Sequence, residues 1–383
     1  MTWRALIVGD VHLRTDDNTD DTVAALEIAA QVAQAQSVDA VLFGGDIYEK
    51  ASTPHERAIF ARVLGYLSNA HVYGVRGNHD AHEDLEVFNH LPNNTWVETP
   101  AIIEAGPVDI LMVPWPDRGF LAAVGHAGEE GDRAGSTALA AMLRGIVALH
   151  DPKRPLILNA HLQVLGALSS SAQPLIGKSI EAVLGDLLDL GLTAGFISHV
   201  HKPQQLAPGI EYVGSLTVHD FGEEEEEKRV GILTIDDSTA ASVEWLPTPC
   251  RRWVTIEAFV GQEDESEYET GQVYESLGGH LMDGWHPSQI EVRIAGANLR
   301  YRFTCTEEQQ HLFDHTEIER RFARAHTLKI VPQVERAERV RAAEVAAARS
   351  LEEKFRAYCQ VIDLAVTEHH IEKLHELESE LMG

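Results

Sequence analysis

Five short apolar runs dominate the pattern of hydrophobic and polar positions along the chain. They read WRALIVGDVH, VDAVLFGGD, YGVRGNHD, RPLILNAH and TAGFISHVH, and each ends in Asp, Asn or His. Continuous runs rich in Val, Ile, Leu and Phe, bounded by Gly, Pro or polar residues, are typical of strands that are buried on both faces. The pattern therefore predicts five buried β-strands.

Helix-like stretches separate the first three runs. They lie at residues 22–37 and 55–69, so the first part of the chain alternates strand and helix. A further helix is predicted at 138–150, after a Gly-rich loop at 125–138. This alternation predicts an α/β fold, in which ligand sites collect outside the carboxyl ends of the strands.

The pattern changes near residue 250, where two prolines in LPTPC punctuate the chain. The alternating segment RRWVTIEAFV is followed by SQIEVRIAGANLRYRFTC, QQHLFDHTEIERRFARA and HTLKIVP, an order that predicts strand, strand, helix and strand. A chain of 383 residues is too long for one ordinary core. We therefore predict a first domain at 1–248, a small α+β domain at 251–331, and a charged helical segment at 333–383.

Composition limits what the chain can do on its own. It carries 60 acidic and 31 basic residues, a net charge of −29, whereas a free-standing nucleic-acid binder usually has a basic surface. Residues 320–356 are locally basic, and a partner subunit would supply further positive charge. The run Glu223–Glu227 is interpreted as a solvated hairpin turn.

Cysteine use and hydropathy predict a cytoplasmic protein. The three cysteines are widely spaced, which gives no disulfide framework and suits the reducing cytoplasm of a bacterium or a virus-infected cell. No run of 18 apolar residues is present, and the opening MTWRALIVGD is interpreted as the entry to a strand rather than a signal peptide. No association with a membrane is expected.

The polar side chains that end the five runs have the chemistry of metal ligands. They are two Asp, one Asn and four His, namely Asp10, His12, Asp46, Asn78, His161, His199 and His201. This oxygen and nitrogen set without Cys suits Mn²⁺, Fe²⁺ or Zn²⁺ better than Ca²⁺. Seven ligands exceed the needs of one tetrahedral ion and suit two ions that share a bridging carboxylate. Two ions roughly 3.5–4 Å apart clamp the attacking and leaving oxygens of a phosphoryl displacement, so hydrolysis of a phosphate ester is predicted.

The ordered motifs D-x-H, G-D, G-N-H-D, H and S-H-x-H resemble the signature of calcineurin-like metallophosphoesterases. The resemblance implies a metallophosphoesterase β-sandwich flanked by helices. It also implies how the ligands are shared between two ions, with Asp46 as the bridge: Asp10, His12 and His201 at one ion, and Asn78, His161 and His199 at the other.

The turn that carries Asn78 would also supply the acid of the reaction. In the enzymes that the chain resembles, the His after this Asn lies near the leaving-group oxygen, so His79 would act as general acid and not as a ligand. Asp80 would orient the His79 ring, as an outer carboxylate fixes the tautomer of an imidazole.

Within that superfamily, four stretches are most similar to SbcD, the nuclease subunit of the SbcCD complex and of the related meiotic recombination nucleases. They are SHVHKPQ, YVGSLTVHDFGEEEEEKRVGILTID, GDIYEKASTPHERAIF and ILMVPWPDR. The resemblance implies a nucleoid-associated DNA exonuclease and endonuclease that uses two Mn²⁺ ions, with Mg²⁺, Fe²⁺ or Zn²⁺ as alternatives, and a cap at 251–331 that shapes DNA access. Two positions depart from the family: Ser198 replaces its usual Gly, and Glu49 stands where some relatives carry a His and others an acid.

The C-terminal segment is predicted to bind a partner. Two apolar stripes with spacings of three and four residues run along 335–382: Leu351, Phe355, Tyr358 and Ile362, then Ile371, Leu374, Leu377 and Leu381. The resemblance implies that this segment docks on the coiled coil of an SbcC-like ATPase. The complex would be a heterotetramer that contains a homodimer of this chain and acts on double-stranded DNA ends and single-stranded DNA. The alternative is that both helices fold back on the cap.

Two other functions stay open. The same metal site would serve a phosphodiesterase or phosphatase that acts on a small molecule or a protein, and a scaffold with a vestigial site is the non-enzyme alternative. The cap and the C-terminal helices favour the nuclease, because a small-substrate enzyme has no need of them. His219 is expected outside the site, as a surface or core residue, and Asn159 has no identified partner.

Overall fold

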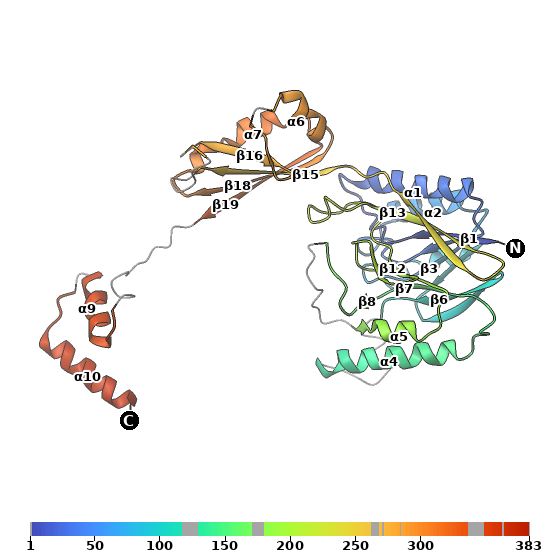
Figure 1. Cartoon of the computed structure of the whole chain (residues 1–383), viewed down its shortest axis with the longest axis horizontal. Helices are drawn as coiled ribbons and strands as arrows, with labels where there is room; N and C mark the ends of the chain where they lie inside the picture. The colour runs from blue at the N-terminus through green and yellow to red at the C-terminus, as the bar shows by residue number, and fades with distance from the viewer. Residues whose placement is uncertain are drawn as a thin grey trace. The chain divides into compact units, whose positions relative to one another are not determined.

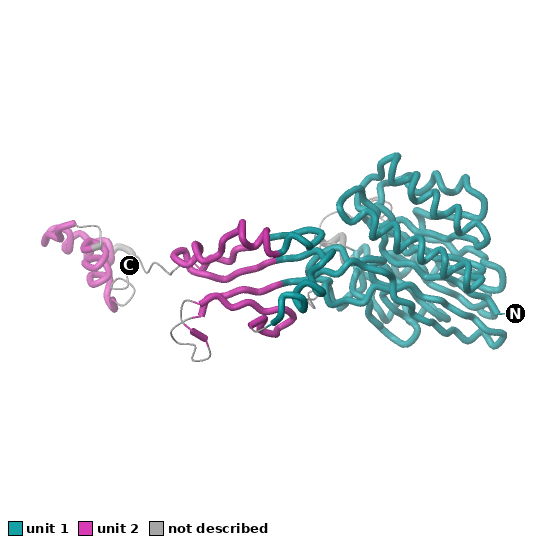
Figure 2. Tube along the Cα trace, turned by 90° about the horizontal axis from the view of Figure 1, so that it is seen from above, with its two compact units in different colours: residues 1–255, 285–300, 322–329 teal, residues 256–284, 301–321, 330–383 magenta. Residues whose placement is uncertain are grey.

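The computed structural model describes most of the chain, and its elements fall into two compact units. The described residues are 2–116, 129–170, 180–261, 268–269, 272–283, 285–335, 348–361 and 364–382. Unit 1 comprises Met1–Thr255, Trp285–Arg300 and Phe322–Lys329, and unit 2 comprises Ile256–Gly284, Tyr301–Arg321 and Ile330–Gly383 (Figure 2). The division into domains 1–248, 251–331 and 333–383 stays a prediction.

The first sheet of unit 1 contains three of the five predicted strands. Its members are β1 (Trp3–Val8), β2 (Ala40–Phe43), β3 (His71–Val75), β4 (Asn94–Val97), β13 (Arg229–Ile235) and β14 (Ala241–Pro247). The strand order is β14-β13-β1-β2-β3-β4, and β1 to β4 pair in parallel. Because parallel strands point the same way, the carboxyl ends of β1, β2 and β3 meet at one edge.

The second sheet contains the other two predicted strands, β7 and β10. Its members are β5 (Ala101–Ala105), β6 (Val108–Val113), β7 (Leu156–His161), β10 (Ala194–Ser198), β11 (Gln204–Ala207) and β12 (Ile210–Tyr212). The order is β11-β12-β10-β7-β6-β5, with β6, β7, β10 and β12 in parallel. Two short strands, β8 (Gln163–Val164) and β9 (Glu181–Ala182), pair beside it.

The two sheets pack face to face, because alternate side chains of their strands share one core. Ala5 and Ile7 of β1 lie in this core together with Ile110 of β6 and Phe196 of β10. The intervening side chains face outward under helices, which Figure 1 shows on both sides of the sandwich: α1 (Thr19–Ala35) and α2 (Pro54–Tyr66) on one, α4 (Glu129–Val147) and α5 (Leu184–Leu188) on the other. The predicted α/β class and helix-flanked sandwich are confirmed.

Local sequence accounts for the helices of unit 1. The predicted stretches at 22–37 and 55–69 coincide with α1 and α2, apart from a few residues at the ends. α2 begins with a capping box, in which the side chains of Thr53 and Glu56 each accept from the other's backbone N–H. α4 begins earlier than expected, so the prediction of a loop at 125–138 is wrong from Glu129 onward. Residues 125–128 lie outside the described part of the chain.

The remaining strands form a five-stranded sheet in the order β17-β16-β15-β18-β19. Their bounds are Trp253–Val260 for β15, Val273–Leu277 for β16, His280–Leu281 for β17, Asn298–Thr306 for β18 and Thr327–Glu335 for β19; helices α6 (Pro287–Ile294) and α7 (His315–Arg321) accompany them. The prediction of a strand across SQIEVRI is wrong, because this stretch forms α6. His286 caps the helix and Pro287 starts it, which overrides the alternating pattern of the sequence.

Among the residues described after Glu335, α9 (Leu351–Val361) and α10 (Glu368–Met382) are helical. Leu351 and Tyr358 of the first predicted stripe are exposed, as is Leu377 of the second, whereas Ile362 lies outside the described residues. β19 runs to Glu335, so the segment expected to be helical from residue 333 begins in a strand. A search of the described residues finds no helix with the length and apolar character to cross a bilayer.

Candidate metal centre

Five strands from two sheets deliver the predicted ligands to one place. The first sheet contributes Asp10, His12, Asp46 and Asn78, and the second contributes His161, His199 and His201, each at or just beyond the carboxyl end of its strand. Three of them have positive φ angles, +49° at His12, +47° at Asp46 and +106° at His199. Strained backbone of this kind collects at functional sites and persists only where the surrounding structure fixes it.

The Asp46 carboxylate lies between the two predicted ligand groups. Its Oδ2 is 3.6 Å from His12 Nε2 and 3.4 Å from His161 Nε2, one imidazole from each group. Its Oδ1 accepts a hydrogen bond of 2.8 Å from the backbone N–H of His79. This close approach requires glycine at position 77, where a Cβ atom would lie 2.0 Å from Asp46 Oδ1. The carboxylate is placed as a bridging ligand needs to be.

The first ligand group joins β1 to β10. His12 Nε2 lies 3.0 Å from His201 Nε2. Asp10 is fully buried, and its Oδ1 accepts a hydrogen bond of 2.9 Å from the backbone N–H of His199. His12 Nδ1 lies within ion-pair distance of Glu49 Oε2, at 3.1 Å, while Nε2 faces the centre.

The second ligand group has the same character. Asn78 Oδ1 lies 3.0 Å from His161 Nε2 and 2.8 Å from His199 Nδ1. His161 Nδ1 lies 2.9 Å from the carbonyl oxygen of Gly44, which can only accept, so Nδ1 carries the ring proton. Once a bound cation has replaced the proton on Nε2, the lone pair of Nε2 and the Asn78 oxygen would both be available to that cation as ligands.

His79 and Asp80 share a turn but make different contacts. His79 is exposed, and its Nδ1 lies 2.8 Å from the backbone carbonyl oxygen of Glu49. Asp80 is buried, and it accepts hydrogen bonds from the backbone N–H groups of Tyr48 (3.0 Å) and Gly77 (2.9 Å). These contacts differ from the predicted one, because the Glu49 carbonyl and not the Asp80 carboxylate meets the His79 ring. Asp80 instead holds the turn itself.

Burial and close charges shift the pKa values of several buried groups in the centre. Burial raises the pKa of Asp10. Burial alone would lower the pKa of His161, but the Asp46 carboxylate raises it to about 9. Burial and the neighbouring Asp46 raise the pKa of Asp80 to about 6. Buried carboxylates this close to one another favour positive charge between them, and the oxygen and nitrogen donors fit divalent ions of the Mn²⁺, Fe²⁺ and Zn²⁺ type.

Two overlapping groups of three side chains are each close enough together to hold a metal ion. Ligand atoms of Asp46, His161 and His199 lie within 4.8 Å of one another, and so do those of His12, Asp46 and His79. Asp46 belongs to both, in keeping with its central place. The second triad includes His79, so the geometry alone leaves this residue close enough to a metal to be tested as a ligand.

Three residues at the centre were missed by sequence reasoning. Glu223 is buried and pairs with His201 Nδ1 at 2.6 Å, so its interpretation as part of a solvated turn is wrong. Lys228, also buried, pairs with Glu223 at 2.9 Å. His219, expected outside the site, has its ring 4.9 Å from that of His12. A run of identical acidic residues carries no signal that distinguishes the buried member from the solvated ones.

Asn159 now has a partner, and its role is structural. Its Nδ2 donates a hydrogen bond of 3.0 Å to the backbone carbonyl of Phe43 in β2, which ties the second sheet to the first. Trp115 packs against the ring of His199, with 4.6 Å between ring centroids. Both contacts support the wall of the centre.

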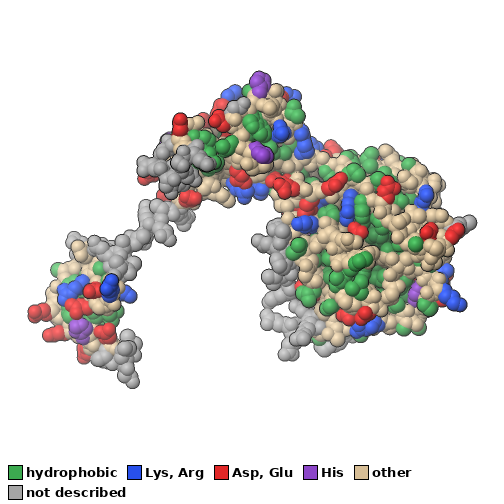
Figure 3. Space-filling view, viewed as in Figure 1, with side chains coloured by type: hydrophobic (Ala, Val, Ile, Leu, Met, Phe, Trp, Pro, Cys, Tyr) green, Lys and Arg blue, Asp and Glu red, His purple; other side chains and the backbone are tan. Residues whose placement is uncertain are grey.

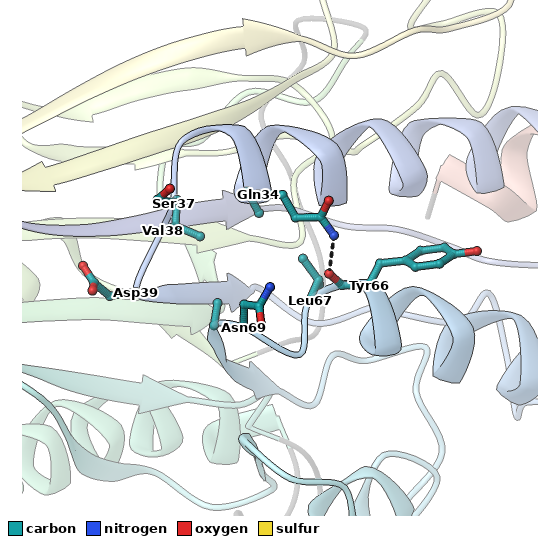
Figure 4. Close-up of a pocket in the computed structure, with 9 residues that line it drawn as sticks. Gln34, Ser37, Val38, Asp39, Tyr66, Leu67 and Asn69 are labelled. Carbon is teal, nitrogen blue, oxygen red and sulfur yellow. Dashed lines mark hydrogen bonds between the residues drawn. The ribbon is translucent and has the colours of Figure 1, made fainter.

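A cavity of about 350 Å³ lies at the other end of the strands (Figure 4). Its lining includes the ends of α1 and α2, where Gln34 Nε2 donates to the carbonyl of Tyr66 at 2.7 Å. Asp39 and Ala70, also in the lining, precede β2 and β3, whereas the predicted ligands follow these strands. The cavity is therefore separate from the metal centre.

The chain matches one family profile and is similar to several solved structures. The family profile described as calcineurin-like phosphoesterase matches residues 4–203, a range that contains all seven predicted ligands. No curated protein matches the chain. A dimetal phosphatase from Danio rerio is similar in structure at 11% identity, over 64% of this chain and 96% of that chain, with a TM-score of 0.41. A protein of Thermus thermophilus is similar at 15% identity, over 64% of this chain and 99% of that chain, with a TM-score of 0.38.

Proposed function

The chain belongs to the calcineurin-like phosphoesterase family, and from this premise we propose that it is a Mn²⁺-dependent DNA exonuclease and endonuclease. It would act as the SbcD-like catalytic subunit of an ATPase–nuclease complex that processes DNA ends. Members of this family hydrolyse phosphate esters with two divalent metal ions. The observation that supports the proposal is that the seven predicted ligands meet at one place, in a chain that continues into a five-stranded sheet and two further helices, α9 and α10. A hydrolase of small substrates has no need of these additions.

The ligand assignment follows the two groups. Asp46 would serve both ions, with Asp10, His12 and His201 at the first and Asn78, His161 and His199 at the second. Bound there, two divalent ions supply Lewis-acid activation of water and charge stabilisation at the leaving oxygen. The chain's own part is to hold the donors fixed. Hydrogen bonds from backbone N–H groups to Asp10 and Asp46 leave each carboxylate little freedom to turn.

His79 would donate the proton to the leaving 3′-oxygen. Its exposure leaves it accessible to a DNA strand. The Glu49 carbonyl, 2.8 Å from Nδ1, fixes the ring through one nitrogen and leaves Nε2 of the protonated ring to face the substrate. Through this contact the backbone carbonyl of Glu49, rather than its side chain, would orient the His79 ring toward the substrate.

DNA binding would depend on a partner. The chain has a net charge of −29, and on the face shown in Figure 3 Lys and Arg side chains are interspersed with Asp and Glu rather than gathered in one stripe. Duplex DNA carries a negative charge about every 1.7 Å of its axis, so such a surface offers it little attraction. A basic ATPase subunit would supply the missing charge.

The C-terminal helices are the proposed docking element for that ATPase. Leu351, Tyr358 and Leu377 are 44%, 53% and 47% exposed, large apolar side chains on short helices that build little core of their own. An amphipathic helix of this kind lays its apolar face on a partner, here the coiled coil of an SbcC-like protein. The assembly would be a heterotetramer built on a homodimer of this chain.

A phosphodiesterase or phosphatase acting on a small molecule or a protein is the second candidate. The acidic, interspersed surface favours it, because an unaided nuclease needs basic contacts to the phosphate backbone. The two candidates share the metal centre and differ in substrate.

A substrate comparison tests the proposal. The purified chain, alone and with its ATPase partner, is assayed on labelled duplex and single-stranded DNA in Mn²⁺, Mg²⁺ or chelator, beside a chromogenic phosphodiester. A nuclease cleaves DNA in Mn²⁺ and stops in chelator. Turnover of the chromogenic ester with DNA left intact, even in the presence of the ATPase, would favour the second candidate.

A further inference from the structure

A buried ion pair stands directly behind His201. Glu223 is 2% exposed although it opens a run of five acidic residues. Its Oε1 lies 2.6 Å from His201 Nδ1, and its Oε2 accepts from the backbone N–H of His219 at 3.1 Å and pairs with Lys228 Nζ at 2.9 Å. The Lys228 ammonium, fully buried, also pairs with Glu226 at 2.7 Å and donates to the His201 carbonyl at 3.1 Å. Both carboxylate oxygens of Glu223 therefore have donors.

The direction of these hydrogen bonds fixes the His201 ring. An ionised carboxylate only accepts, so the proton of the neutral imidazole lies on Nδ1 and the lone pair of Nε2 faces His12. We propose that Glu223, held by Lys228, is a positioning residue that fixes His201 as an Nε2 ligand and so sets the affinity of the first metal site. The inference rests on the proposed two-metal assignment and extends it to residues outside the ligand set.

The Nδ1 atoms of His12 and His161 face weaker acceptors than that of His201, so we expect the two metal sites to differ in affinity. The Glu49 carboxylate behind His12 is 34% exposed and lies 3.1 Å from its Nδ1. His161 Nδ1 has the neutral carbonyl of Gly44 at 2.9 Å as its hydrogen-bond acceptor, and the nearest carboxylate oxygen behind it, Asp10 Oδ1, lies farther away at 3.6 Å. A charged, buried acceptor raises the basicity of the imidazole more than a neutral or solvated one does. The site that contains His201 is therefore the tighter of the two.

Glu223→Gln is the variant of choice, because the amide has the size of the carboxylate but lacks its charge. Lys228 keeps its ion pair with Glu226 in this variant, so no buried ammonium is left without a carboxylate. Glu225→Gln is the matched control, since Glu225 is an exposed member of the same run and the change removes the same charge.

The experiment titrates Mn²⁺ into the metal-free full chain by calorimetry. Wild type and Glu225→Gln should bind two ions in separate steps, and Glu223→Gln should weaken the tighter step about 10–100-fold while leaving the other unchanged. In a His201→Gln background, Glu223→Gln should add no further loss, because the carboxylate acts through that ring. Unchanged affinity in Glu223→Gln, equal weakening of both steps, or a full further loss in the His201→Gln background would each overturn the inference.

A second measurement needs no variant. Nitrogen-15 NMR of the metal-free wild type should show His201 protonated at Nδ1, and protonation at Nε2 alone would contradict the proposed hydrogen bond. Both readouts are independent of DNA cleavage. A wild-type chain that binds two ions in unequal steps but leaves DNA intact even with its ATPase partner would defeat the proposed nuclease and leave this inference standing.

Discussion

His12 Nε2 and His201 Nε2 lie 3.0 Å apart, although 189 positions separate the two residues in the sequence. The Nδ1 atom of each ring faces a carboxylate, that of Glu49 at 3.1 Å and that of Glu223 at 2.6 Å. The Glu223 carboxylate accepts the proton of His201 Nδ1, so the lone pair of His201 Nε2 faces the His12 ring. A cation between the two rings would take both Nε2 atoms as ligands. The pair is arranged as two ligands of one ion.

Asp46→Ala should remove both metal ions and abolish hydrolysis, because one carboxylate oxygen faces an imidazole of each ligand group. Metal content per chain, measured by elemental analysis after dialysis, should fall from two to none. Asp39→Ala is the control, since Asp39 lies at the opposite end of the strands. Retention of one tightly bound ion by Asp46→Ala would show that the carboxylate serves one site and does not bridge.

His79→Asn should separate binding from chemistry. Loss of a general acid lowers turnover about 10²–10⁴-fold, while metal content and affinity for substrate stay unchanged. The control is His82→Asn, which alters another exposed histidine three positions along the same turn. A loss of metal in His79→Asn equal to its loss of turnover would identify His79 as a ligand, as its closeness to His12 and Asp46 allows.

The ligands could be predicted from sequence because one physical rule governs them all. A buried strand gives a continuous apolar run, and the first polar residue after it marks the carboxyl end. Parallel pairing then brings such ends together, as it does for Asp46 and Asn78 after β2 and β3. The rule identifies residues that lie at strand ends and says nothing of those that approach from elsewhere.

Glu223 and α6 show where that rule stops. The burial of Glu223 depends on Lys228 and His201, contacts made only in the folded chain, whereas its four acidic neighbours present the same local sequence. In α6 the alternation of SQIEVRI favours a strand, but the His286 cap and Pro287 provide a helix start that decides the local conformation. The burial of Glu223 therefore depends on tertiary contacts, and the helix α6 depends on its cap, and the periodicity of the sequence predicts neither.

Glu56→Gln tests the scaffold under the metal centre. Glu56 accepts from the backbone N–H of Thr53 at 2.7 Å and of Thr15 at 3.0 Å, and although burial opposes it, these hydrogen bonds lower the pKa of Glu56 below its ordinary value of 4.5. A lowered folded-state pKa means that the ionised carboxylate stabilises the fold above pH 4.5 and that this contribution is lost as the pH falls toward the folded value. We expect Glu56→Gln to lower the free energy of unfolding by about 1–2 kcal/mol at pH 7 and by less at pH 4.

Urea unfolding of the metal-free chain at the two pH values measures this difference. Glu244→Gln is the control, because Glu244 is exposed on β14 and the change removes the same charge at the surface. An equal loss of stability at pH 7 and pH 4 in Glu56→Gln would mean that the negative charge of Glu56 does not contribute to the free energy of unfolding.

Ending the chain after Ala348 tests the docking role proposed for the C-terminal helices. This truncation removes α9 and α10 and keeps β19 complete to Glu335, which a cut after Pro332 would not do. Metal binding and Mn²⁺-dependent cleavage of a chromogenic ester should be unchanged, because every predicted ligand lies before residue 204. Co-purification with the ATPase and ATP-stimulated DNA cleavage should be lost.

Point variants on α9 separate docking from folding. Leu351→Asp with Tyr358→Asp places charge on the exposed apolar stripe, and both side chains are about half exposed, so the helix itself should tolerate the change. Gln360→Asp is the control for added charge, because it places one negative charge, against two in the stripe variant, at an exposed position on the other side of the helix. The stripe variant should weaken ATPase binding as strongly as the truncation does, and the control should bind like wild type. Undiminished binding by the truncated chain would mean that the ATPase docks elsewhere and that the apolar stripe packs within this chain instead.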